Sequence, residues 1–117
     1  MRRRVAKLLE DVRDAGALIQ SYLADASEAE FLDDSLLRDA VQRRFEIIGE
    51  ALRLLRNEDA QLAIRISDLQ HIVDFRNALA HGYDAVDDRR VWRIAQTRLP
   101  KLMQEIAVLL EEETARD

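Results

Sequence analysis

One arginine of this sequence lies where a helix would present an apolar face. Arg76 falls within the segment 67–83, in which apolar residues recur at the three- and four-residue spacing of a helix. The stripe comprises Leu69, Ile72, Val73, Leu79 and Ala80. A guanidinium in the middle of such a stripe is costly to bury unless an anionic or polar group meets it. Arg76 is therefore a candidate for contact with a carboxylate or phosphate. The alternatives are a snorkelling side chain or an internal ion pair to Glu46 or Glu50.

A histidine closes the same segment. Five residues at about 100° each place His81 roughly 140° around the helix from Arg76, on a polar face. That face also carries Gln70, Asp74 and Asn77. In the last turn, the negative end of the helix dipole favours the imidazolium form of His81. One helix cannot aim Arg76 and His81 at one point, whereas two copies related by a two-fold axis could. The alternative for His81 is a plain capping role, and we interpret His71 as structural or exposed.

The elements that position these residues are predicted to be helices. Apolar residues make up 48% and charged residues 35% of the 117-residue chain, with only three Gly and one Pro, a balance typical of long helices. Apolar residues recur at helical spacing in four stretches, 5–23, 37–55, 67–80 and 91–109. We predict an all-α, antiparallel up-and-down helical bundle that occupies residues 1–117 as a single domain.

The segments between these stretches predict where helices begin and end. Residues 25–34 show no period, and we expect a loop there. Residues 57–66 are short and mixed, which predicts a turn with a brief helical piece. Ser67 is expected to be the N-cap of the third main helix, and Gly82 its left-handed C-cap.

Pro100 in the stretch 91–109 and Gly49 in the stretch 37–55 are residues that helices usually avoid. Asp87 or Asp88 is expected to cap the last helix, which Pro100 should divide into two pieces near 98–100. Gly49 lies in mid-helix, where it costs about 1 kcal/mol relative to Ala. Close approach of another helix is the simplest explanation for Gly49.

Composition and charge exclude several classes of protein. Cysteine is absent, which excludes disulfides, thiolate chemistry and Cys-based metal sites. The net charge of -5 argues against a protein that coats duplex DNA through a bulk positive field. No acidic cluster stands at ligand spacing from a histidine, so we expect no metal and no other cofactor. No apolar run approaches membrane-spanning length, and no apolar signal core follows the basic N-terminus, so we expect no membrane partner and a cytoplasmic location.

The segment from Arg76 to Tyr83, with the sequence RNALAHGY, fits the R-x4-H-x-Y motif of HEPN-domain proteins and closely resembles the HepT-like toxin family. The resemblance extends to further segments: 31–32, 39–41, 45–51, 91–92 and 99–100. Together they cover about residues 30 to 110. The sequence departs from the family before the motif, where members often carry a proline and a tryptophan and this chain has Ile64-Arg65-Ile66-Ser67.

The resemblance implies a homodimer whose R-x4-H motifs meet at the interface to form a metal-independent ribonuclease site. Arg76 and His81 of both subunits would line one cleft, with RNA as the substrate. By this resemblance His81 is the acid/base, Arg76 clamps the phosphate and the transition state, and Asn77 orients or contacts phosphate. General acid–base catalysis and cations near the phosphorane suit this cleavage.

The resemblance also implies a partner. HepT-like toxins of type VII-like toxin–antitoxin pairs are often encoded beside a minimal nucleotidyltransferase, an antitoxin that transfers AMP to the motif tyrosine, here Tyr83. The alternative for Tyr83 is a loop tyrosine whose ring packs on the bundle. For the whole chain, the alternatives are a non-catalytic helical module that binds RNA or a nucleotidyltransferase, and a plain helical dimer without a ligand.

Overall fold

The computed structural model describes residues 2–81 and 87–116, and every regular element within these ranges is a helix. In chain order the helices are α1 (Arg3–Leu23), α2 (Glu28–Asp33), α3 (Ser35–Glu58), α4 (Ala60–Ile64), α5 (Leu69–Ala80), α6 (Asp88–Thr97) and α7 (Leu99–Thr114). No strand occurs in the described ranges. The predicted all-α bundle is confirmed.

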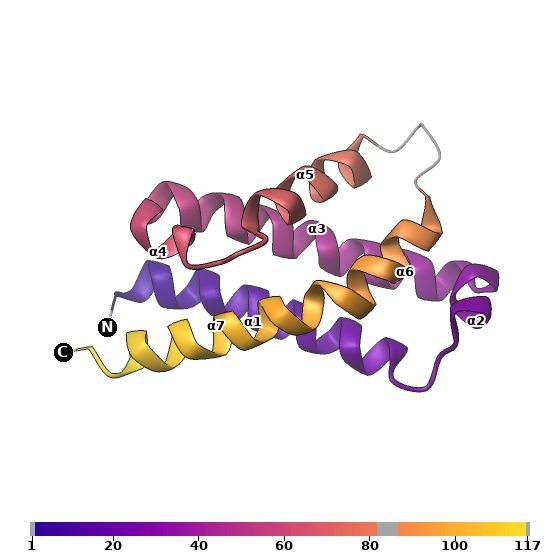
Figure 1. Ribbon diagram of the computed structural model, residues 1–117, viewed down its shortest axis with the longest axis horizontal. Coiled ribbons are helices and arrows are strands. Elements are labelled where there is room, and N and C mark those ends of the chain that lie inside the picture. The colour runs from indigo at the N-terminus through magenta and orange to yellow at the C-terminus, as the bar shows by residue number, and fades with distance from the viewer. Residues whose placement is uncertain (1, 82–86, 117) are drawn as a thin grey trace.

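The long helices run side by side along the longest dimension of the molecule (Figure 1). Helix α1 packs chiefly against α3 and α7, while α5 packs along α3. The two ends of the chain lie near each other at one end of the bundle, and α5 ends and α6 begins toward the other (Figure 1). No helix in the described ranges is long and apolar enough to cross a membrane.

The expected break in the last helix is confirmed. Helix α6 ends at Thr97, and Pro100 lies in the first turn of α7. A proline is tolerated there because its missing N–H would have no partner within the helix. Asp87 caps α6, since its side chain accepts a hydrogen bond from the backbone N–H of Arg89 at 3.0 Å.

Two sequence-based expectations about helix starts are wrong. The expected loop over 25–34 contains α2, which a reciprocal capping box starts: Ser27 Oγ accepts from the Glu30 N–H, and Glu30 accepts from the Ser27 N–H. This helix of six residues is too short to show a period, yet it buries Phe31. Ser67 is not an N-cap, because α5 begins two residues later and the Ser67 hydroxyl donates to Glu105 of α7 at 2.5 Å.

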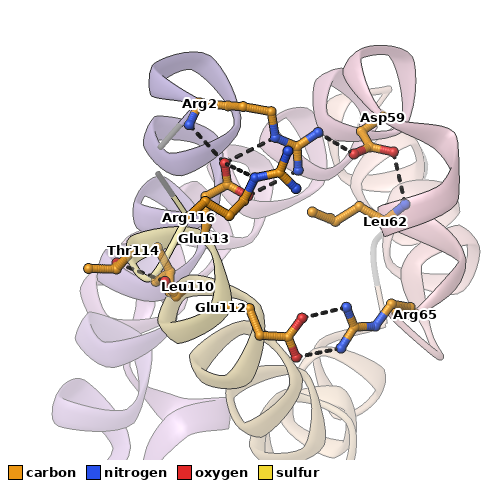
Figure 2. Close-up of polar contacts among 9 residues, drawn as sticks. All are labelled: Arg2, Asp59, Leu62, Arg65, Leu110, Glu112, Glu113, Thr114 and Arg116. Carbon is orange, nitrogen blue, oxygen red and sulfur yellow. Dashed lines mark hydrogen bonds and ion pairs between the residues drawn. The ribbon is translucent and has the colours of Figure 1, made fainter.

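A clasp of charged residues joins the two ends of the chain (Figure 2). The guanidinium of Arg2 donates to both oxygens of Glu113 at 3.0 Å and to Asp59, at the start of α4, at 2.6 Å. Glu113 also accepts from the Arg2 backbone N–H at 2.8 Å and is only 2% exposed. These bonds hold the pKa of Glu113 below its ordinary value and outweigh the loss of solvation, which acts in the opposite direction.

The clasp predicts how the variant Glu113→Gln responds to pH. A carboxyl whose pKa is lower in the folded chain stabilises the fold above its unfolded pKa of about 4.3, and this contribution is lost as pH falls through the folded value. At neutral pH the variant should therefore lose about 2 kcal/mol of unfolding free energy, the loss expected for hydrogen bonds to a charged group. The difference from the parent should shrink as pH falls below about 4. Urea unfolding across this pH range measures it.

The matched control is Glu111→Gln, which makes the same charge change on an exposed residue of α7. Its stability should follow that of the parent at every pH. If the difference in unfolding free energy between Glu113→Gln and the parent stayed constant down to acidic pH, the proposed role of an ionised Glu113 would be contradicted.

Candidate functional site

Arg76 lies where α5 packs tightly against α3. A Cβ atom added to Gly49 of α3 would lie 2.2 Å from Cβ and 2.5 Å from Cγ of Arg76. Real side chains never approach so closely, so only glycine at position 49 lets the aliphatic stem of Arg76 rest on the α3 backbone. This confirms that Gly49 marks the close approach of another helix.

The guanidinium of Arg76 extends from this contact to two polar partners. One terminal nitrogen donates to Asn77 Oδ1 at 3.2 Å, and the other lies 3.5 Å from Glu50 Oε2. The Nε atom is buried and has no hydrogen-bond partner among the described residues. The side chain keeps 30% of its surface exposed. Because a guanidinium has five N–H donors, Arg76 keeps donors for an additional anion.

Glu50 is shared between two arginines. Arg53, one turn further along α3, donates to both carboxylate oxygens of Glu50, at 2.6 and 3.2 Å. These bonds lower the pKa of Glu50, with a smaller contribution from the charge of Arg76. Arg53 therefore holds Glu50 more tightly than Arg76 does, and the Glu50–Arg76 contact is the weaker of the two. The ion pair to Glu50, one alternative raised by the sequence, is present and leaves Arg76 partly accessible.

A hollow of about 270 Å³ opens beside this group. Its lining contains Arg76, Glu50, apolar side chains of α1 and α3, and further charged residues of the same two helices. The lining residues are Leu8, Asp11, Arg43, Glu46, Glu50, Arg76, Ile47, Ala51 and Leu54. Arg76 thus borders open space beside the bundle.

His81 is the C-cap residue of α5 and is exposed. Its backbone N–H donates to the Asn77 carbonyl at 3.2 Å, but its side chain takes part in no hydrogen bond or ion pair with a described residue. The structure therefore joins Arg76 to Asn77, whereas the His81 side chain makes no hydrogen bond or ion pair with either of these two residues. Tyr83 and Gly82 lie outside the described residues. His71 is half-buried.

The apolar stripe of α5 differs from the predicted one at two positions. Phe75 is 1% exposed, and its ring meets that of Phe45 edge-on at 5.2 Å. Ala80 is exposed, because it is the last residue of the helix and no described element covers it. The guanidinium carbon of Arg90 lies over the Phe75 ring, 5.3 Å from its centroid. Sequence reasoning missed this contact between α6 and the residue next to Arg76.

Within residues 2–81 and 87–116, no three histidine, aspartate or glutamate side chains come together as ligands of a metal ion would.

An all-α bundle with an arginine on one helix, and a histidine five residues later at the C-cap of that helix, is consistent with a HEPN-like domain. Comparison with known families agrees with this class, since the model of the ribonuclease HepT-like family matches residues 12–109. The chain belongs to the ribonuclease HepT-like family.

Curated relatives include proteins of Thermococcus cleftensis and Methanocaldococcus jannaschii. A candidate HepT ribonuclease of Thermococcus cleftensis is 32% identical over 102 residues, which are 87% of this chain and 92% of the relative. A candidate RNase of Methanocaldococcus jannaschii is 29% identical over 108 residues, 92% of this chain and 98% of the relative. A second protein of that organism has a name that joins a gamma-glutamylcyclotransferase to a candidate RNase. It is 34% identical over 112 residues, which are 96% of this chain, and this chain spans half the length of that protein. No solved structure gives a significant match.

The contact between Gly49 and Arg76 predicts the outcome of two Gly→Ala substitutions. Alanine at position 49 should destabilise the fold by about 2 kcal/mol, because the new methyl group overlaps the stem of Arg76 and forces α3 and α5 apart. Urea unfolding measures the change.

Gly16→Ala in α1 is the matched control. Its added Cβ would meet chiefly the sulfur of Met103, at 2.3 Å, and this flexible side chain can turn away. Gly16→Ala should therefore be neutral or gain up to about 1 kcal/mol from the better helix former. Equal stability of the two variants would contradict the tight α3–α5 contact.

Proposed function

We propose that this protein is a metal-independent endoribonuclease, the toxin of a type VII-like toxin–antitoxin pair, with a composite active site at the interface of a homodimer. The observation that carries the proposal is Arg76, a guanidinium held at the edge of the bundle beside Asn77 and five residues before an exposed His81. Membership of the ribonuclease HepT-like family supports RNA as the substrate. The names of the archaeal relatives point the same way.

The chemistry needs two copies of the chain. Arg76 and His81 point in different directions around α5, so a two-fold axis near this helix would bring one Arg76 and one His81 from each subunit into a cleft. One imidazole would then take the proton of a 2′-hydroxyl group, and the other would protonate the departing 5′-oxygen. The guanidiniums would stabilise the charge that develops on the phosphorus-bound oxygens. Asn77 would keep its neighbour Arg76 in place through the hydrogen bond it accepts.

A non-catalytic module that binds RNA or a nucleotidyltransferase is the alternative. The net charge of -5 favours it, as does the contact of Glu50 with Arg76, which already offers the guanidinium an anion. The alternative predicts binding without cleavage, so a cleavage assay separates the two functions.

Purified protein should cleave single-stranded RNA, and chelators should leave the rate unchanged. His81→Ala should lower the rate by about 10²–10⁴-fold through loss of the acid/base. Arg76→Ala should lower it by about 10²–10³-fold through loss of charge stabilisation. The measurement is single-turnover cleavage of a labelled RNA, with circular dichroism to verify that each variant folds.

His71→Ala, at the other histidine of the chain, is the matched control and should cleave like the parent. Light scattering on the same samples tests the composite site, with twice the chain mass of 13.5 kDa as the expected result. Cleavage that requires a divalent ion, survives His81→Ala, or comes from a monomer would overturn the proposed mechanism.

Tyr83 is proposed as the site at which a minimal nucleotidyltransferase antitoxin silences the protein. Each added AMP would bring negative charge and bulk close to His81 and repel RNA phosphate. Co-production with a cognate nucleotidyltransferase should therefore increase the intact mass by whole AMP units, which peptide mapping should assign to Tyr83. The modified protein should no longer cleave RNA.

Tyr83→Phe should block the modification and keep the protein active in the presence of the antitoxin. Tyr22→Phe is the control, because Tyr22 is half-buried on α1. AMP on another residue, or silencing of the Tyr83→Phe variant, would mean that the antitoxin acts by binding alone.

A further inference from the structure

Three arginines lie on one face of α6. Arg89, Arg90 and Arg93 are spaced three and four residues apart, so their side chains are neighbours on the helix surface. Arg89 and Arg93 are exposed, and Arg90 is half-buried. We call these three residues the α6 arginine face.

The α6 arginine face differs from most arginines of this acidic chain. Ten arginines in the described ranges form ion pairs with carboxylates. None of the three on α6 pairs with a carboxylate that the structure describes. The other arginines that lack a described ion pair, Arg3, Arg44 and Arg56, are spread along α1 and α3. Only on α6 do such cations gather on one helix face within the described ranges.

Two acidic residues of the described ranges, Asp87 and Asp88, immediately precede the α6 arginine face in sequence, but each has another partner. Asp87 caps α6 through the backbone N–H of Arg89. Asp88 lies 3.4 Å from the guanidinium of Arg38 and accepts a hydrogen bond from Gln42, both on α3. Among the residues that the structure describes, no carboxylate therefore engages the guanidiniums of Arg89, Arg90 and Arg93, and their N–H donors remain for another group.

The position of Arg90 connects this face to the candidate active site. Its guanidinium rests 5.3 Å from the ring centroid of Phe75, an arrangement that a cation–π attraction stabilises. Phe75 immediately precedes Arg76 in α5. Helix α5 ends and α6 begins toward the same end of the molecule (Figure 1). A strand of nucleic acid bound at Arg76 and His81 could therefore continue onto α6.

We propose that the α6 arginine face binds the phosphate backbone of the RNA substrate beyond the cleaved bond. The inference rests on the proposed ribonuclease function for the identity of its ligand. Guanidiniums bind phosphate through paired hydrogen bonds and carry no base preference in such contacts, so this face supplies affinity rather than sequence specificity. It also explains how a chain with a net charge of -5 holds a polyanion.

The test is equilibrium binding of a fluorescent single-stranded RNA to the His81→Ala protein, with anisotropy as the readout. The slope of log K against log salt concentration is negative, and each lost phosphate contact lowers its magnitude by about 0.7. Adding Arg89→Gln and Arg93→Gln should therefore lower the magnitude of the slope by about 1.4. The loss of affinity should be about sevenfold larger at about 50 mM than at about 200 mM salt.

Arg3→Gln and Arg13→Gln, on α1, make the same change in net charge at exposed positions and serve as the control. They should leave the slope within error of the His81→Ala parent. An unchanged slope in the α6 variant, an equal effect in the α1 control, or no RNA binding by the parent would overturn the proposal. An acidic protein that binds the parent and not the α6 variant, with RNA binding unchanged, would assign the face to that partner instead.

The binding result is independent of catalysis. If the α6 variant shows the lower slope while the protein with His81 intact cuts no RNA, the RNA surface stands and the ribonuclease function fails. If the protein cuts RNA and the slope does not change, the ribonuclease function stands and the α6 surface fails.

Discussion

The close contact of α3 and α5 at Gly49 is the constraint on which the candidate site depends. Without a side chain at position 49, the stem of Arg76 lies against the α3 backbone and its guanidinium reaches the surface beside Glu50. A charged residue thereby occupies a central position of an apolar helix face: its methylene groups and Nε are buried, while its two terminal nitrogens reach polar partners. In the same helix, the Phe75 ring contacts the ring of Phe45 on α3 and the guanidinium of Arg90 on α6.

Glu50 is the carboxylate that pairs with Arg76 in the structure. Its carboxylate is held chiefly by Arg53, and its contact with Arg76 is long. A phosphate that approaches Arg76 would compete with the Glu50 carboxylate, which is already paired with Arg53. Displacing Glu50 from Arg76 therefore costs less free energy than breaking an isolated ion pair. Arg76 is thus kept in place by packing more than by charge, which is the preorganisation that a phosphate-binding residue needs.

The sequence predicted the parts of the structure that are controlled by apolar period and by local backbone chemistry. The long helices, the break at Pro100, the Asp87 cap and the contact at Gly49 all follow from signals within a few residues. Helix α2 was missed because six residues give no period, although its Ser27–Glu30 capping box was visible. Two other contacts join residues far apart in the sequence, which the spacing of apolar residues cannot reveal. They are the ion pair between Asp68 and Arg98 and the contact of Arg90 with the Phe75 ring.

The clasp at the chain ends has a consequence for the architecture of longer proteins. Arg2 and Glu113 bring the first and last helices together at one end of the bundle, while α5 ends and α6 begins toward the other (Figure 1). A domain fused to either terminus would therefore emerge away from His81 and the α6 arginines and leave them sterically open. Because one buried carboxylate ties down both ends, their fraying is coupled, and a strain applied at one attachment point would be transmitted to the other.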